Sequence, residues 1–327
     1  MTDRLAKLWL AAALVSAGPV VSPEMGRAAT RDVIVDADPG DDIDDAFALA
    51  LLLRSPELHV LGITTAFGDT ALRARWVDQM LRQAGRGGIP VAAGLPTAPR
   101  TAFTQARLAR REPARDWPDA IGFTLALLRS HPAGSITLLE LAPPTNVGAM
   151  IARDPVAFRR LARVVMMGGS IRVGYDGGRP VPEYNLAGDP DGMQHLLASG
   201  VPVSLLPLDS TRITLDEKTR NRIFASGSGL TDMLALAYAQ WATLNRWGTT
   251  PLLFDVVPVE VMIAPELCPM QALRITVASD GMVREGGGTL VEACLASRAE
   301  GIVRLLSARL DQPSSSRSSA SQPSARP

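Results

Sequence analysis

Residues 32–53 read DVIVDADPGDDIDDAFALALLL, and this stretch decides the fold. A β-branched run at 33–35 is typical of a buried strand, and the unbroken apolar run at 46–53 predicts a buried helix. Between them, six aspartates occupy the ten positions 36–45, and no basic residue lies anywhere in 32–53. We therefore expect the acidic turn at the inner end of a core element rather than on the rim of the molecule.

Crowded carboxylates need compensation. Two carboxylates about 5 Å apart repel by roughly 3 kcal/mol at an effective dielectric near 20, so four or more in one turn cannot all stay ionised unaided. Oxygen-only ligands, with no thiolate or imidazole nearby, favour Ca²⁺ or Mg²⁺ over Zn²⁺. The alternative is a solvated acidic loop that caps a helix N-terminus, but one or two aspartates would satisfy that role.

An EF-hand calcium loop is excluded. Such a loop requires Gly at its sixth position and Glu at its twelfth. Counted from Asp36, those positions hold Asp41 and Phe47.

The segment DADPGDDIDDA, after a hydrophobic strand, resembles the N-terminal signature of the inosine-uridine preferring nucleoside hydrolases, Asp-x-Asp-Pro-Gly-x-Asp-Asp-Ala. This chain has two more residues between the Gly and the final Asp pair. Either Asp41–Asp42 or Asp44–Asp45 can therefore be the functional pair. We favour Asp44–Asp45, because Ala46 and the buried helix follow it directly.

Composition indicates an ordinary globular protein. The chain has 327 residues, 46% of them apolar, with 33 basic and 33 acidic side chains, and this length suits one large α/β domain or two small ones. The balanced charge gives no field for nucleic acid, so no nucleic-acid partner is expected.

The two ends differ from the middle of the chain. Residues 1–30 have the layout of a secretory signal peptide followed by a short extension, too short for a membrane span, which predicts a periplasmic or secreted protein; a disordered extension is the alternative. Residues 311–327 are rich in Ser, Pro and Arg and are expected to be disordered. This leaves residues 31–310 as one catalytic domain. Cys268 and Cys294 are equally compatible with one disulfide or two buried thiols.

From residue 32 onward, short apolar runs alternate with helical patterns. This order predicts an α/β fold with a doubly wound, mostly parallel sheet flanked by helices. The expected strands are 33–35, 58–65, 89–93, 135–141, 163–167, 201–206, 273–277 and 290–294, and the expected helices are 46–53, 69–84, 119–129, a stretch from 145, 190–198, 215–224, 230–247, 254–263 and 298–310.

Ligands of such sheets bind at the carboxyl ends of the strands. Polar or Gly-rich segments follow several of the expected strands: Asp36 and Asp38, residues 65–69, residues 144–146, residues 167–169 and Asp209. The topology alone therefore predicts a pocket at this edge.

Four further segments resemble family motifs in the family's order. LAPPTNV (141–147) matches the segment whose Thr carbonyl binds calcium, which implies that Thr145 is a ligand, although Ala142 and Pro144 depart from the usual residues; an N-cap is its alternative role. GITTAFGDT (62–70) places Asp69 where the family has an Asn facing ribose, with helix capping as the alternative.

The last two motifs lie in the C-terminal half. VMMGG (165–169) followed by EYN (183–185) forms one of them and implies substrate contacts for Met167, Glu183 and Asn185. LLFDVVPV (252–259) implies that Asp255 is a metal ligand, and it has Phe254 where some members have a His that protonates the leaving base.

The resemblance covers roughly residues 32–310 and implies hydrolysis of the N-glycosidic bond of ribonucleosides, giving ribose and free base. It implies Ca²⁺ as the cofactor and homo-oligomers, dimers or tetramers. The water that attacks the sugar would be bound to the metal and activated by an Asp, and carboxylates would stabilise the oxocarbenium-like transition state. The roles implied are Ca²⁺ binding by Asp38, Asp45, Asp255 and the Thr145 carbonyl, general base for Asp38, and sugar orientation for Asp44, Glu183 and Asn185.

Two other functions compete. A haloacid-dehalogenase-type phosphatase also begins with strand-Asp-x-Asp, but it needs a Lys near the phosphoaspartate, and Lys218, the one Lys beyond the signal-like segment, lies between helices. A calcium-dependent protein that binds nucleosides without cleaving them is the other alternative, because the His acid is missing at Phe254.

Overall fold

Strand β1 (Arg31–Ala37) organises the sheet of the computed structural model, which describes residues 30–246 and 248–311. β1 pairs in parallel with β2 (Leu58–Thr65) on one side and with β4 (Ile136–Glu140) on the other. Val33 and Val35 pack into the apolar cluster on one face, and Ile34 packs into the cluster on the other, as the two-residue period of a strand buried on both faces requires.

In the described part of the chain, nine strands form one sheet in the order β3-β2-β1-β4-β5-β6-β9-β7-β8. All neighbours pair in parallel except β7, which is antiparallel to both β8 and β9. The remaining strands are β3 (Val91–Ala93), β5 (Arg163–Met167), β6 (Val203–Leu206), β7 (Met270–Val277), β8 (Val283–Glu285) and β9 (Thr289–Cys294).

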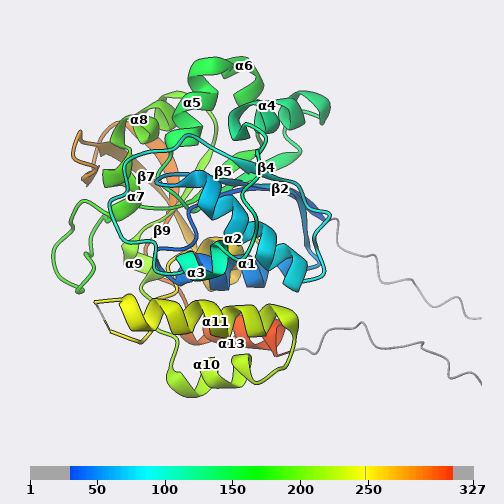
Figure 1. Ribbon diagram of the computed structural model, residues 1–327. Helices are drawn as coiled ribbons and strands as arrows, with labels where there is room; N and C mark the ends of the chain where they lie inside the picture. Colours follow the sequence, from blue (N-terminus) through cyan, green and yellow to red (C-terminus); the bar gives the residue numbers. More distant parts are fainter. Residues whose placement is uncertain (1–29, 247, 312–327) are drawn as a thin grey trace, which may run out of the picture.

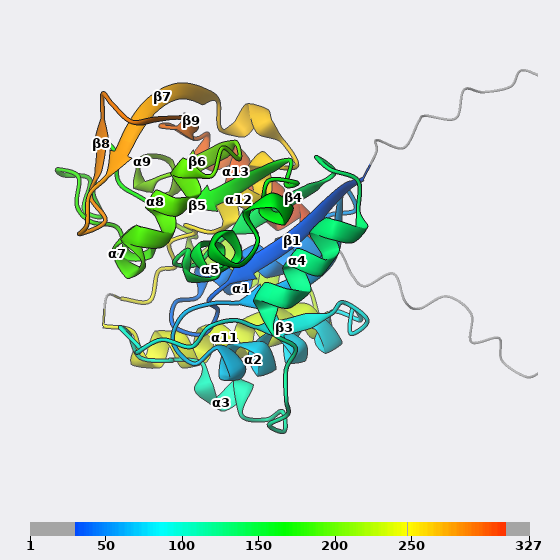
Figure 2. The same ribbon diagram turned by 90° about the horizontal axis from the view of Figure 1, so that it is seen from above.

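Helices cover both faces of the sheet (Figures 1 and 2). One apolar cluster is built on α1, α2, α11, α12 and α13, and the second on α4, α5 and α8. The doubly wound, mostly parallel fold predicted from the sequence is therefore confirmed. The helices are α1 (Asp44–Leu53), α2 (Thr70–Gln83), α3 (Ala106–Ala109), α4 (Ala120–Ser130), α5 (Thr145–Arg153), α6 (Pro155–Phe158), α7 (Tyr184–Gly188), α8 (Pro190–Ala198), α9 (Leu208–Thr211), α10 (Glu217–Phe224), α11 (Gly229–Leu244), α12 (Val256–Val261) and α13 (Ala299–Leu310), with a 3₁₀ turn at Pro265–Leu267.

Most expected elements are present, and several bounds agree to the residue. Strands β2 and β5 and helix α8 have the predicted limits, and α2 lies between Asp69 and Ala84, which serve as its caps. Strand β8 and the short helices α3, α6, α7 and α9 were not expected. Each has three to five residues, which is too few for a period to show.

The two cysteines form a disulfide, Cys268–Cys294, which decides between the two possibilities that the sequence left open. It links the segment before β7 to the last residue of β9. The predicted signal segment and tail fall in 1–29 and 312–327, outside the described residues, so those assignments stay predictions. No helix within 30–246 and 248–311 is long and apolar enough to cross a membrane.

Candidate active site

The order of the sheet reverses between β1 and β4, and chain direction places the carboxyl ends of both strands at the same edge. Asp36, in β1, accepts hydrogen bonds from Thr64 Oγ1 at 2.6 Å and Asn146 Nδ2 at 2.9 Å. Burial raises its pKa to about 6, and both hydrogen bonds oppose that rise. Asp36 therefore ties β1 to β2 and α5 at the point where the site begins.

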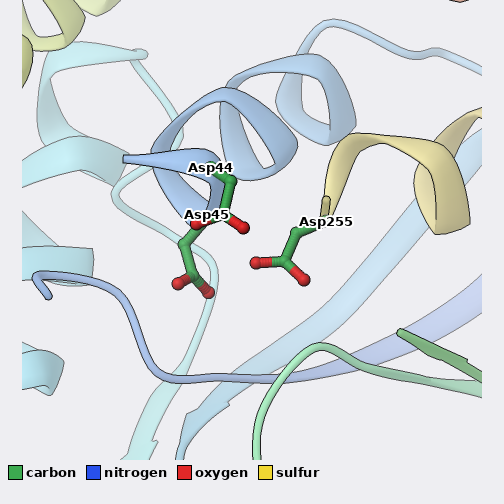
Figure 3. A group of neighbouring side chains, drawn as sticks. All are labelled: Asp44, Asp45 and Asp255. Carbon is green, nitrogen blue, oxygen red and sulfur yellow. The ribbon is translucent and has the colours of Figure 1, made fainter. Parts of the chain in front are cut away.

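The acidic turn ends in a buried group of three carboxylates. Asp44 and Asp45 begin α1, and Asp255 immediately precedes α12, 210 positions further along the chain. Each offers one oxygen, and these oxygens lie within 4.8 Å of one another. Figure 3 shows the Asp44 and Asp45 side chains leaving the first turn of α1 beside Asp255.

The three carboxylates have perturbed pKa values. Burial, and after it the repulsion of neighbouring carboxylates, raises the pKa of Asp44, Asp45 and Asp255 well above the ordinary range. Asp45 Oδ1 is buried and has no hydrogen-bond partner among the described residues. An orphaned buried oxygen beside two more carboxylates fits a cation, so this group could bind a metal.

One buried cation already balances part of the charge. Arg73 of α2 is 2% exposed, and its Nη2 lies 3.8 Å from Asp38 Oδ2. The same guanidinium donates to the carbonyls of Asp38, Pro39 and Phe67. Arg73 was not predicted as a site residue, because its partners are distant in sequence. The sequence does contain a pattern that indicates its burial, since Arg73 lies three residues before Trp76 and seven before Met80 on the buried face of α2.

Asp41 pairs with Arg73 and does not belong to the three-carboxylate group. Its two carboxylate oxygens accept from Arg73 at 3.1 and 3.0 Å, and its Oδ2 also accepts from the Thr101 hydroxyl. Asp42 is exposed, and its Oδ1 accepts from the Ile43 backbone N–H. Of the two candidate pairs, the structure brings Asp44–Asp45, not Asp41–Asp42, together with Asp255.

Asp38 follows β1 and is buried next to the group. Burial raises its pKa to about 7, Arg73 opposes the rise, and the Asp41, Asp36 and Glu183 carboxylates add to it. In turn, the Asp38 charge is the largest of the neighbouring contributions that raise the pKa of Asp45. Asp38 is thus electrostatically coupled to Asp45 and lies outside the tight group of three.

Thr145 is the first residue of α5, the helix that follows β4. The N-cap position belongs to Pro144, which has no capping side chain, so the alternative of Thr145 as the N-cap is wrong. Its hydroxyl is buried without a hydrogen-bond partner in the described part of the chain. The adjacent Asn146 bonds Asp36, which fastens the start of α5 to β1.

Glu183, Asn185 and Met167 lie together at the ends of β4 and β5. The Glu183 carboxylate accepts the backbone N–H groups of Gly169, Asn185 and Leu186 at 2.8 to 3.2 Å, and burial raises its pKa against these bonds. Asn185 Nδ2 donates to the carbonyls of Leu141 and Met167 at 3.1 and 3.2 Å. The EYN segment is therefore locked to the sheet edge by its own side chains.

Asp69 has the capping role that the sequence left open. Its Oδ1 accepts from Leu72 N–H at 3.0 Å at the start of α2, and its side chain is exposed. Phe254 precedes Asp255, as expected, and its ring packs edge-on against Tyr175 with centroids 6.0 Å apart. Tyr175 was not singled out by the sequence, because nothing in the loop 174–182 shows which side chain faces the site.

The three histidines of the chain lie elsewhere. His59 pairs with Asp32 near the amino ends of β2 and β1, and His131 follows α4. His195 is exposed on α8, in the helix layer on the face of the sheet opposite α12. No histidine is therefore available beside Phe254.

A family model for the inosine-uridine preferring nucleoside hydrolases matches residues 33–308. The chain belongs to this nucleoside hydrolase family. The match includes every residue of the group of three carboxylates and every motif segment described above, which confirms the resemblance seen in the sequence. The protein is accordingly an enzyme of the nucleoside hydrolase class.

Among curated relatives of this nucleoside hydrolase, a pyrimidine-specific ribonucleoside hydrolase of Citrobacter koseri is 30% identical over 275 residues, which cover 78% of this chain and 86% of that protein. An uncharacterised protein of Schizosaccharomyces pombe is 33% identical over 229 residues, 65% of this chain and 72% of the relative.

Solved structures show the same fold. A plant nucleoside hydrolase superposes with a TM-score of 0.77 at 24% identity, covering 86% of this chain and 99% of the plant chain. A purine-preferring ribonucleoside hydrolase from Gardnerella vaginalis superposes with a TM-score of 0.72 at 20% identity, with 86% and 98% coverage.

Proposed function

We propose that the protein hydrolyses the N-glycosidic bond of ribonucleosides, releasing ribose and the free nucleobase, and that it depends on Ca²⁺. One observation carries this proposal: Asp44, Asp45 and Asp255, from segments far apart in the chain, converge as a buried group next to Asp38. Membership of the nucleoside hydrolase family supports the reaction.

Ca²⁺ suits the donors at this edge, which are carboxylate oxygens without thiolate or imidazole. In our proposal Asp38, Asp45, Asp255 and the Thr145 carbonyl hold it, and Asp44 can add an oxygen, since it belongs to the same group. When bound, the cation supplies positive charge that favours deprotonation of a nearby water and orients ribose hydroxyls.

The chain's own residues then have separate tasks. Asp38 accepts the proton of the attacking water in this proposal. It is buried beside the three carboxylates, and burial raises its pKa in the metal-free protein. The surrounding carboxylates stabilise the positive charge that develops on the sugar as the bond to the base breaks. Asp44, Asp69, Met167, Glu183 and Asn185 are our candidates for contacts to the substrate.

Release of free ribose from a panel of purine and pyrimidine nucleosides, with Ca²⁺ and with a chelator, tests this function. We expect ribose release that the chelator abolishes and added Ca²⁺ restores. Measurable binding with no ribose from any nucleoside would instead favour the nucleoside-binding protein, a reading supported by the absence of histidine beside Phe254. Lys218 is exposed on α10, so no phosphatase is proposed.

Two further parts of the proposal concern the cell and the assembly. We propose a periplasmic or secreted location, which the Cys268–Cys294 disulfide supports because such bonds persist in oxidising compartments. We also propose a homodimer or homotetramer. The exposed Leu236 and Leu244 on α11 offer apolar surface for such an assembly.

A further inference from the structure

Tyr175 is the aromatic residue that the loop between β5 and α7 presents beside Phe254. A tight turn shapes the loop, with Gly174 N–H donating to the Gly178 carbonyl and Gly177 N–H donating to the Gly174 carbonyl. Arg212 Nε donates to the Tyr175 carbonyl at 2.7 Å. The position of Tyr175 is therefore fixed from two sides.

The base of the loop is braced as well. Asp209 of α9 accepts the backbone N–H groups of Ile171 and Arg172 at 2.9 and 2.8 Å. Ser170 Oγ donates to the Val173 carbonyl and accepts from Val181 N–H. A loop held by this many bonds presents a side chain in one orientation, which a specific contact requires.

The Tyr175 hydroxyl has a proton to give. It accepts the Tyr184 N–H at 2.9 Å, a bond that uses an oxygen lone pair and leaves the O–H free to donate. Partial burial, and after it the Glu183 and Asp44 carboxylates, raises the pKa of Tyr175 above its ordinary value. The hydroxyl is thus a neutral donor at physiological pH.

The surroundings of Tyr175 indicate what it contacts. Its ring meets Phe254 edge-on at an interplanar angle of 89°, and 41% of the residue remains exposed. Phe254 adjoins Asp255, so this pair of rings borders the carboxylate group. Polar side chains from the other segments suit a sugar, whereas two aromatic rings suit the flat face of a nucleobase.

We propose that the Tyr175 hydroxyl donates a hydrogen bond to the leaving nucleobase. This bond stabilises the negative charge that develops on the base, in a site without histidine. This inference rests on the proposed function. As water adds to the anomeric carbon and gives its proton to Asp38, the bond to the base nitrogen breaks and its electron pair stays on the base. The Tyr175 O–H then bonds the ring nitrogen or carbonyl oxygen that carries the charge, and the base takes a proton from solvent.

The test compares Tyr175→Phe with wild type on two leaving groups. Inosine and uridine leave as poorly stabilised anions, whereas the nitrophenolate of p-nitrophenyl riboside needs no donor. A lost hydrogen bond to a charged acceptor corresponds to a roughly tenfold to hundredfold loss of kcat on the nucleosides. On p-nitrophenyl riboside we expect less than about a twofold change, by the same reasoning.

A matched control and a third substrate complete the design. Tyr238→Phe removes a hydroxyl of α11 that bonds the Thr249 carbonyl, and thermal unfolding of both variants verifies that they fold. Equal loss on nucleosides and p-nitrophenyl riboside overturns the proposal, as does no loss on either. A loss that disappears with 5′-deoxyinosine also overturns it, because Tyr175 then binds the sugar. A wild-type protein inactive on all substrates refutes the proposed function instead.

Discussion

Replacing Asp45 by Asn should stabilise the metal-free protein. The Asp45 oxygen lies within 4.8 Å of those of Asp44 and Asp255, and two ionised carboxylates at this distance repel by about 3 kcal/mol at an effective dielectric near 20. Asn keeps the shape and removes the charge. Because the variant also loses the attraction of Asp45 to Arg73 and to the N-terminus of α1, we expect a net gain of about 2 kcal/mol, or about 4 °C in Tm.

The gain depends on pH in a defined direction. The pKa of Asp45 is raised in the folded protein. Wild type therefore keeps its full stability below the ordinary carboxyl pKa near 4, where Asp45 is protonated in the folded and unfolded states, and loses stability as pH rises toward the raised value. The difference between the two metal-free proteins should therefore be largest at pH 8 and should shrink toward pH 4.

Added Ca²⁺ should make wild type more stable than Asp45→Asn. Thermal unfolding after chelator treatment, with and without added Ca²⁺, measures both effects. Saturation at 100 times the dissociation constant would raise the stability of wild type by about 2.7 kcal/mol, whereas the variant should gain little. Asp232→Asn is the control, since Asp232 is an exposed acid in the first turn of α11. The reasoning is refuted if Asp45→Asn destabilises the metal-free protein or gains as much from Ca²⁺ as wild type.

Two more predictions concern stability. Glu260 is fully buried, and burial raises its pKa from 4.5 to about 9, so the free energy of unfolding should fall as pH rises between these values. Glu260→Gln should remove about 3 kcal/mol of that loss at pH 7. Urea unfolding with the same pH dependence in both proteins would contradict this prediction. Reduction of Cys268–Cys294, separated by 26 residues, should lower the free energy of unfolding by about 3 to 4 kcal/mol, and an unchanged urea midpoint would show that the bond is not formed.

The sequence predicted the elements whose periodicity is long and regular. Strand β2 and helix α8 have the expected limits because an apolar run and a Pro start mark them locally. Helix α7 was missed because its start depends on the Glu183 carboxylate accepting two backbone N–H groups. A five-residue helix stabilised by one cap leaves no periodic pattern to read.

Site residues that lie within a family motif could be predicted from the sequence. Site residues that come from segments without a motif could not. Asp44, Asp45 and Asp255 were expected from the sequence, and the structure brings them together. Arg73 and Tyr175 come from α2 and from a loop with no regular pattern. Their place at the site follows from tertiary packing, such as the contact of Tyr175 with Phe254, which a single sequence does not show.

Calcium binding to chelator-treated protein, measured by isothermal titration calorimetry, tests the central claim most directly. The claim is that Asp255, brought from the far end of the chain, completes a cation site with Asp45 at the start of α1. We predict one Ca²⁺ bound per wild-type chain and no measurable binding by Asp255→Asn under the same conditions. Undetectable binding by wild type, or the same affinity in Asp255→Asn, would contradict the account.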